Sequence, residues 1–229
     1  MGDRYTLTVD SDAVASRFGV EVADHYRPRY NAAPTQLLPV ITQQSKGLSY
    51  FYWGQTPERA KNHTLSKKLI YADGEWLKEK ASLRNALSFH RCMIPADSYY
   101  DWKRISKKGR VAHRVLFGNT ELVGIAGLWE EFENEQGEVA HTFRIITSPA
   151  PSQELGERVP SVVKKAQEHI WLGEETDPEK LMTCIGHYPA DKISMYTVSP
   201  QIEDVEKDHP GLIGHFAPAD QFGNYSLFD

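Results

Sequence analysis

Residues 83–103, LRNALSFHRCMIPADSYYDWK, change their hydrophobic spacing along the stretch. The first part belongs to a segment, residues 81–90, whose apolar side chains recur at the spacing of one helix face. Residues 92–95 and 98–102 are short runs rich in apolar and aromatic side chains, which is typical of strands. The stretch therefore predicts one helix that leads into two strands.

The rest of the chain continues this mixture, with more strands than helices. Further strands are predicted at residues 4–9, 38–42, 48–53, 113–117, 121–128, 142–147 and 193–198, and helices at 11–18, 164–172 and 178–185. Strand and helix do not alternate regularly and no repeat is present, which excludes a doubly wound parallel sheet. We expect an α+β fold, a single domain over residues 1–229 with mainly antiparallel strands closing toward a barrel and a few peripheral helices. Charge-rich stretches at 58–68, 103–110 and 133–138 are expected to be flexible.

Composition limits the classes of protein to consider. The chain has 229 residues, 40% of them hydrophobic, and no apolar run near the roughly 18 residues that a membrane span needs. We expect a cytoplasmic monomer with no membrane contact, no metal and no other cofactor. The net charge of −5 argues against nucleic-acid binding through overall basicity, but a local cationic groove remains compatible with it. Cys92 and Cys184 are far apart and lack a metal-ligand pattern, so both are expected to be buried.

Several segments, in order, carry a resemblance to a known family. They are MGDRY at residues 1–5, RYNAAPTQ at 29–36, the stretch at 83–103, IAGLWE at 125–130, FRIITSPA at 143–150, ERVPSVV at 157–163 and YTVSPQIEDVEKDHPGLI at 196–213. At this spacing the chain resembles the SOS-response-associated peptidase (SRAP) family over nearly its whole length. The resemblance implies an SRAP-like fold and a role in the DNA damage response.

The family resemblance also implies a specific chemistry. In the family, the initiator methionine is removed and the exposed N-terminal cysteine captures the ring-opened aldehyde of an abasic site in single-stranded DNA. The α-amine and the thiol together form a thiazolidine crosslink, because an amine with a pKa near 8 is partly neutral at pH 7 and a neighbouring thiol closes the ring. The resemblance also implies that the same cysteine serves self-cleavage of any propeptide. Single-stranded or abasic DNA is therefore the implied partner.

This chain departs from the family at the positions that carry that chemistry. Gly2 stands where the family has the cysteine, so we expect no thiazolidine. The family's Asn-Ala-Arg-x-Glu motif falls on YADGE at residues 71–75, which keeps only the glutamate, Glu75, and one alanine. Asp101 stands in place of a catalytic glutamate, and Gly156 in place of a histidine. We interpret the chain as a divergent paralogue with a preserved fold and altered chemistry.

The candidate site residues follow from these matches. The catalytic candidates are Gly2, through its α-amine, and Asp101 and Glu75, through proton transfer. The DNA-binding candidates are Arg4, Asn31, Pro34, Arg84, Trp102 and Arg158, with Arg29 and Arg91 as further cations. His209 is the histidine to test as a replacement for the one lost at position 156.

Three functional hypotheses remain open from the sequence. The chain could bind single-stranded or abasic DNA without crosslinking, or it could retain Schiff-base chemistry through the Gly2 amine. Alternatively, Asp3, Asp73 and Asp101 make the former site more acidic, which favours a protein-interaction or scaffold module that no longer binds DNA. Salt-dependent DNA binding separates the first hypothesis from the last.

Overall fold

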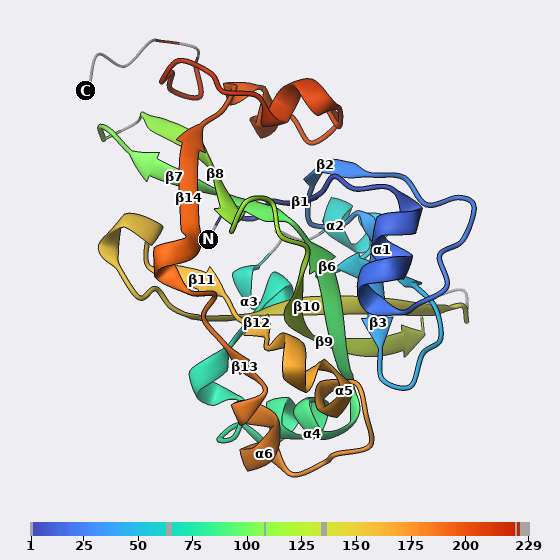
Figure 1. The fold of residues 1–229 in the computed structure, drawn as a ribbon. Coiled ribbons are helices and arrows are strands. Elements are labelled where there is room, and N and C mark those ends of the chain that lie inside the picture. The colour runs from blue at the N-terminus through green and yellow to red at the C-terminus, as the bar shows by residue number, and fades with distance from the viewer. Residues whose placement is uncertain (1, 63–65, 108, 134–136, 223, 225–229) are drawn as a thin grey trace.

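Two sheets organise the protein, seen here in a computed structural model that describes all residues except 1, 63–65, 108, 134–136, 223 and 225–229 (Figure 1). The first sheet has five strands in the order β14-β8-β7-β1-β2. Their bounds are β1 Tyr5–Leu7, β2 Arg29–Ala32, β7 Ser98–Arg104, β8 Arg110–Phe117 and β14 Ile193–Thr197. All neighbours in this sheet are antiparallel.

The second sheet closes on itself. Its order is β11-β10-β4-β3-β6-β9-β12-β13, and β10 also pairs with β9 and with β5. The bounds are β3 Leu37–Thr42, β4 Ser49–Trp53, β5 Tyr71–Asp73, β6 Arg91–Ala96, β9 Val123–Glu133, β10 Val139–Pro149, β11 Arg158–Pro160, β12 Val162–Val163 and β13 Ile185–Gly186. Because β10 pairs with both β4 and β9, the strands β10, β4, β3, β6 and β9 form a closed ring. The predicted α+β fold with strands closing toward a barrel is confirmed.

Helices cover the outside of the second sheet. They are α1 Ser11–Phe18, α2 Pro57–Asn62, α3 Lys67–Ile70, α4 Ala81–Phe89, α5 Glu168–Trp171 and α6 Pro178–Thr183. Local sequence sets the ends of α1: the Asp10 carboxylate accepts from the backbone N–H of Ala13 at 2.9 Å, and Gly19 takes the left-handed conformation. In Figure 1, α4, α5 and α6 gather at one end of the molecule, while the C-terminal segment lies at the other.

Three apolar clusters hold these layers together. One lies between the two sheets and contains Tyr5, Ile94 and Phe143, and another packs α1, α4, α5 and α6 against the second sheet. The third joins β7 and β8 to the C-terminal segment through Tyr100, Val198 and Leu212. Burial of this apolar surface is the main stabilising term of the fold.

Some predicted elements differ from those observed. The helix expected at 164–172 is divided into a 3₁₀ helix, Lys165–Gln167, and α5. The strand expected at 4–9 is shorter, Tyr5–Leu7. Parts of α2 and α3 lie within the stretch 58–68, whose flexibility stays a prediction. Residues 63–65, 108 and 134–136 of the three charge-rich stretches are outside the described residues. Among the described helices, none is long and apolar enough to cross a membrane.

Asp97 occupies the single position between β6 of one sheet and β7 of the other. Its carboxylate is fully buried and accepts from Thr6 Oγ1, from the backbone N–H of Thr8 at 2.5 Å and from Thr8 Oγ1 at 2.7 Å. The Arg114 guanidinium on β8, with 4% of its side chain exposed, donates to the same carboxylate at 3.2 Å. Asp97 therefore ties β1 to the junction of the two sheets.

Asp97→Asn should lower the free energy of unfolding by about 3–5 kcal/mol, because it leaves the buried Arg114 charge without its partner. Urea unfolding followed by circular dichroism measures this change. Glu179→Gln is the matched control, since Glu179 pairs with Lys78 on the exposed surface and should contribute less than about 1 kcal/mol. Equal effects of the two substitutions would contradict the role given to Asp97.

Candidate functional site

A cleft of about 610 Å³ opens between β7, β5 and β11, and we call it the N-terminal cleft. It is lined by Lys67, Lys68, Tyr71, Asp73, Asp101, Trp102, Arg104, Thr147, Gly156, Glu157 and Arg158. Its volume is within the range of small-molecule sites. Segments that are distant in sequence meet here because β5 and β11 both pair with β10.

Gly2 is fixed next to two residues that line this cleft, Tyr71 and Trp102. Its backbone N–H donates to the Tyr100 carbonyl at 3.0 Å, and its own carbonyl accepts from the Tyr71 hydroxyl at 2.9 Å. Burial raises the pKa of Tyr71 above its ordinary value, so the hydroxyl stays protonated and keeps donating. A Cβ atom at position 2 would overlap the six-membered ring of Trp102 and lie 2.9 Å from the Tyr100 carbonyl oxygen. Trp102 thus fills the space that a side chain at position 2 would need.

Asp101 lies in the cleft directly against Gly156. A Cβ atom at position 156 would come within 2.8 Å of Asp101 Oδ2, and the Gly156 backbone has a φ of +79°. The Asp101 carboxylate therefore occupies space that a side chain at position 156 would need. In the sequence, Asp101 and Gly156 were compared with two separate family positions. The structure places them next to each other.

His113 is a histidine near Asp101 that the sequence analysis did not single out. It is the residue opposite Asp101 in the β7–β8 pairing, so the two side chains share one face of the sheet. Burial lowers the pKa of His113, while the Asp101 carboxylate opposes that shift. Only the register of the β7–β8 pairing shows that His113 lies opposite Asp101, because no sequence motif links positions 101 and 113.

Arg158 is held by two carboxylates at the edge of the cleft. Glu75 accepts from its guanidinium at 2.8 and 2.7 Å, and Asp73 Oδ1 lies 3.4 Å away. The hydrogen bonds from Arg158 lower the pKa of Glu75, which keeps the carboxylate ionised at neutral pH. Thr147 accepts a further bond from Arg158 through its hydroxyl at 2.9 Å. Both acidic positions of the altered YADGE motif therefore face an arginine.

The other predicted DNA-binding residues do not gather in the cleft. Asn31 is fully buried, and its amide donates to the carbonyls of three residues of the C-terminal segment, Ile202, Asp204 and Lys207. Pro34 is also buried. Neither side chain reaches the surface in this structure, so the DNA contacts at Asn31 and Pro34 stay predictions that the observed burial does not support.

The predicted arginines have different environments. Arg4 is only 8% exposed and pairs with Asp3 at 3.2 Å, while Arg84 is exposed on α4 and does not line the cleft. Arg91 is fully buried and donates to five backbone carbonyls, so the structure gives no support to a DNA contact there. Arg29 pairs with Asp208 at 3.1 Å. Of the predicted set, Trp102 and Arg158 line the cleft.

Three cations that were not among the predicted DNA-binding residues line the same cleft. Lys67 and Lys68 project from α3 and Arg104 from the end of β7, and all three are exposed. Lys67 and Lys68 belong to the charge-rich stretch 58–68, in which no motif distinguished them from the other charged residues. Exposed cations around a groove are what a nucleic-acid backbone requires.

The two cysteines, His209 and the potential metal ligands also have defined surroundings in this structure. Cys92 and Cys184 are free and buried, as predicted. His209 is exposed and does not line the cleft. No three His, Cys, Asp or Glu side chains lie close enough to hold a metal ion within the residues described.

Comparisons with known proteins agree with this architecture. Residues 1–205 match the family described as SOS response associated peptidase (SRAP). The abasic site processing protein YoqW of Bacillus subtilis is 33% identical over 221 residues, which cover 93% of this chain and 99% of YoqW. YobE, an abasic site processing protein of the same organism, is 33% identical over 214 residues, with 90% and 98% covered.

A crystal structure of a protein from Bacteroides thetaiotaomicron shares the fold. It superposes with a TM-score of 0.79 at 19% sequence identity, covering 94% of this chain and 100% of the other. The match over residues 1–205 and the identity to YoqW extend across nearly the whole chain. This chain therefore belongs to the SOS response associated peptidase (SRAP) family.

Proposed function

We propose that this protein binds abasic sites in single-stranded DNA at the N-terminal cleft and captures them reversibly through the α-amine of Gly2. Membership of the SRAP family and 33% sequence identity to each of two abasic site processing proteins support abasic DNA as the substrate. The observation that carries the proposal is the position of Gly2, which is hydrogen-bonded between Tyr100 and Tyr71 beside the cleft. Residue 2 is thus adjacent to Tyr71, which lines the cleft, and this proximity supports the proposal.

The amine chemistry needs Met1 to be removed. The freed Gly2 amine attacks the C1′ aldehyde of the ring-opened deoxyribose, water leaves, and an imine forms. Position 2 carries no thiol, so no sulfur adds to the imine carbon and the adduct stays reversible. Asp101 is the carboxylate of the cleft best placed to accept a proton, with His113 beside it.

The DNA backbone would be bound by the exposed cations of the cleft. Lys67, Lys68 and Arg104 supply charge that the phosphates need. Trp102 offers an aromatic surface for a base, and its indole Nε1 is held by a 2.6 Å hydrogen bond to Glu203. A fixed ring loses little freedom when a base stacks on it.

A second candidate is an interaction module that no longer binds DNA. The pairing of Arg158 with Glu75 and Asp73, and of Arg4 with Asp3, favours it because those cations are already neutralised. The two candidates differ in one observable, which is salt-sensitive binding to single-stranded DNA.

Single-stranded DNA with one abasic site should give a covalent adduct only when borohydride is present, since reduction turns the imine into a stable amine. Denaturing electrophoresis detects the adduct, and mass spectrometry should place it on the peptide that begins with Gly2. Protein with an acetylated N-terminus is the control and should give none. An adduct that forms equally on acetylated protein would rule out the Gly2 amine and direct the search to Lys67 and Lys68.

Gly2→Cys should restore a thiol but place it against Trp102. The single variant is expected to form a borohydride-independent crosslink at least about tenfold more slowly than the double variant Gly2→Cys/Trp102→Ala, because misplacement of a nucleophile by about 1 Å is costly. Thermal unfolding of both variants checks that the fold is kept. If the single variant reacts as fast as the double one, Trp102 does not limit access to position 2.

Arg158→Gln should weaken binding to single-stranded DNA and reduce the slope of log affinity against log salt by about one. Glu75→Gln should strengthen binding, because it removes the carboxylate that neutralises Arg158. Fluorescence anisotropy at several salt concentrations measures both, with Lys46→Ala as a control for loss of an exposed charge outside the cleft. An unchanged slope for Arg158→Gln means that Arg158 serves only to hold Glu75 and Asp73.

A further inference from the structure

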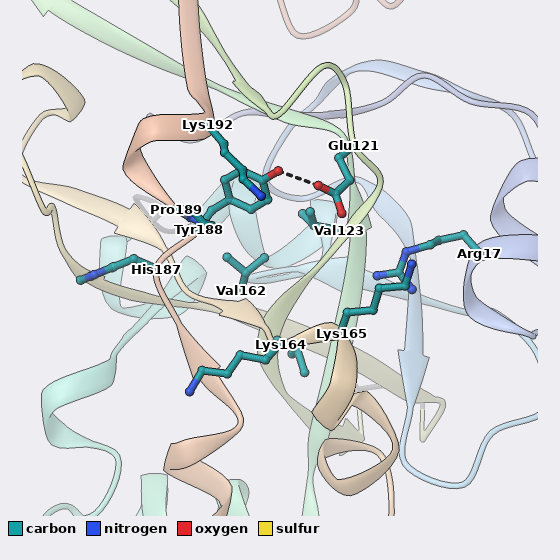
Figure 2. Close-up of a pocket in the computed structure, with 11 residues that line it drawn as sticks. Arg17, Glu121, Val123, Val162, Lys164, Lys165, His187, Tyr188, Pro189 and Lys192 are labelled. Carbon is teal, nitrogen blue, oxygen red and sulfur yellow. Dashed lines mark hydrogen bonds between the residues drawn. The ribbon is translucent and has the colours of Figure 1, made fainter.

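A second cavity, separate from the N-terminal cleft, lies where β12, β9 and α1 come together (Figure 2). Its volume is about 390 Å³, within the range of small-molecule sites. Its lining residues share none with the N-terminal cleft. We call it the basic cavity.

The rim of the basic cavity is cationic although the chain as a whole has a net charge of −5. Lys164, Lys165, Lys192 and Arg17 line it, against one carboxylate, Glu121. Lys165 and Lys192 are exposed and make no ion pair within the part of the chain that the structure describes. Figure 2 shows Lys192 above Val162 and Lys165 to its right, so the two charges approach the cavity from different sides.

The remaining cations are already engaged. Arg17 donates to Glu168 at 3.0 and 2.7 Å, and Lys164 donates to the Thr183 carbonyl at 2.7 Å. These bonds fix the two side chains in place, and they leave Lys165 and Lys192 as the ammonium groups that can turn to a ligand. An ammonium group with three donors and a flexible stem suits a phosphate oxygen.

The floor of the basic cavity is apolar. Val123, Val162 and Val163 are buried at its base, while Pro189, which also lines the cavity, is exposed. The Tyr188 hydroxyl donates to Glu121 at 2.6 Å, which fixes the tyrosine ring and uses one acceptor position of the only lining carboxylate. Burial and the bond to Glu121 raise the pKa of Tyr188 to about 12, so it remains a donor at neutral pH. A flat or apolar body can lie on this floor without burying an unpaired polar group.

We propose that the basic cavity binds a small organic phosphate, a phosphate group carried on a flat body of the size of a nucleoside, with Lys165 and Lys192 on the phosphate and the valine floor under the body. The other carboxylates near these lysines are Glu168, which is held by Arg17, and Asp191, which acts on Tyr188 through charge. This ligand site does not depend on the abasic-site chemistry of the N-terminal cleft.

Isothermal titration calorimetry with the full chain tests the site, using deoxyadenosine monophosphate, deoxyadenosine and inorganic phosphate as probes. The monophosphate should bind at least about tenfold more tightly than either of the other two, because only it engages both the lysines and the floor. The variant Lys165→Ala/Lys192→Ala should weaken its binding by about tenfold. Lys46→Ala/Lys207→Ala removes the same charge elsewhere and should leave it unchanged.

Three results would overturn the proposal. They are no binding of the monophosphate at about 10 mM, equal binding of inorganic phosphate, and full binding by the Lys165→Ala/Lys192→Ala variant. The second result would mean a plain anion site, and the third a site elsewhere on the protein. Arg158→Gln provides an independent check, because it alters the N-terminal cleft and should leave this binding unchanged.

Discussion

The buried carboxylate of Asp97 is the constraint on which the N-terminal cleft depends. It lies at the point where the chain passes from one sheet to the other, and it fixes β1 through Thr6 and Thr8. A buried charge is tolerated only when its hydrogen bonds and its ion pair are complete, so β1 has one position in which Asp97 and Arg114 are both satisfied. Residues 2–4, which precede Tyr5, run beside β7 from that position. The Gly2 backbone N–H donates there to the Tyr100 carbonyl.

The charges of the cleft are arranged in compensating pairs. The acidic residues at positions 3, 73 and 75 do not leave an uncompensated negative surface, since Asp73 and Glu75 bind Arg158 and Asp3 binds Arg4. Charge available to a polyanion therefore comes from α3 and from the end of β7, and from Arg158 only where a phosphate displaces its carboxylate partners. The basic cavity has the opposite arrangement, in which two lysines lie beside an apolar floor. One chain with a negative net charge thus contains two local cationic environments of different kinds.

Local periodicity predicted the helix and strands between residues 81 and 104 because each pattern is complete within a few turns or pleats. The family resemblance predicted the fold, and three of the site residues that it suggested, Asp101, Trp102 and Arg158, line one cleft. It did not indicate that Asn31 is buried, because that burial involves a C-terminal segment far along the chain. The contact between Asp101 and Gly156 and the pairing of Asp101 with His113 depend on strand register, which composition and motif spacing do not contain.

Gly156 has a consequence for the order in which substitutions can be made. Its φ of +79° and ψ of −156° belong to a region that is almost restricted to glycine, and Asp101 occupies the adjacent space. A histidine introduced there would meet both backbone strain and the Asp101 carboxylate. A single substitution of histidine for Gly156 is therefore disfavoured unless the loop and position 101 change as well. Positions 101 and 156 are thus coupled, so that a side chain at one becomes tolerable only after the other has changed.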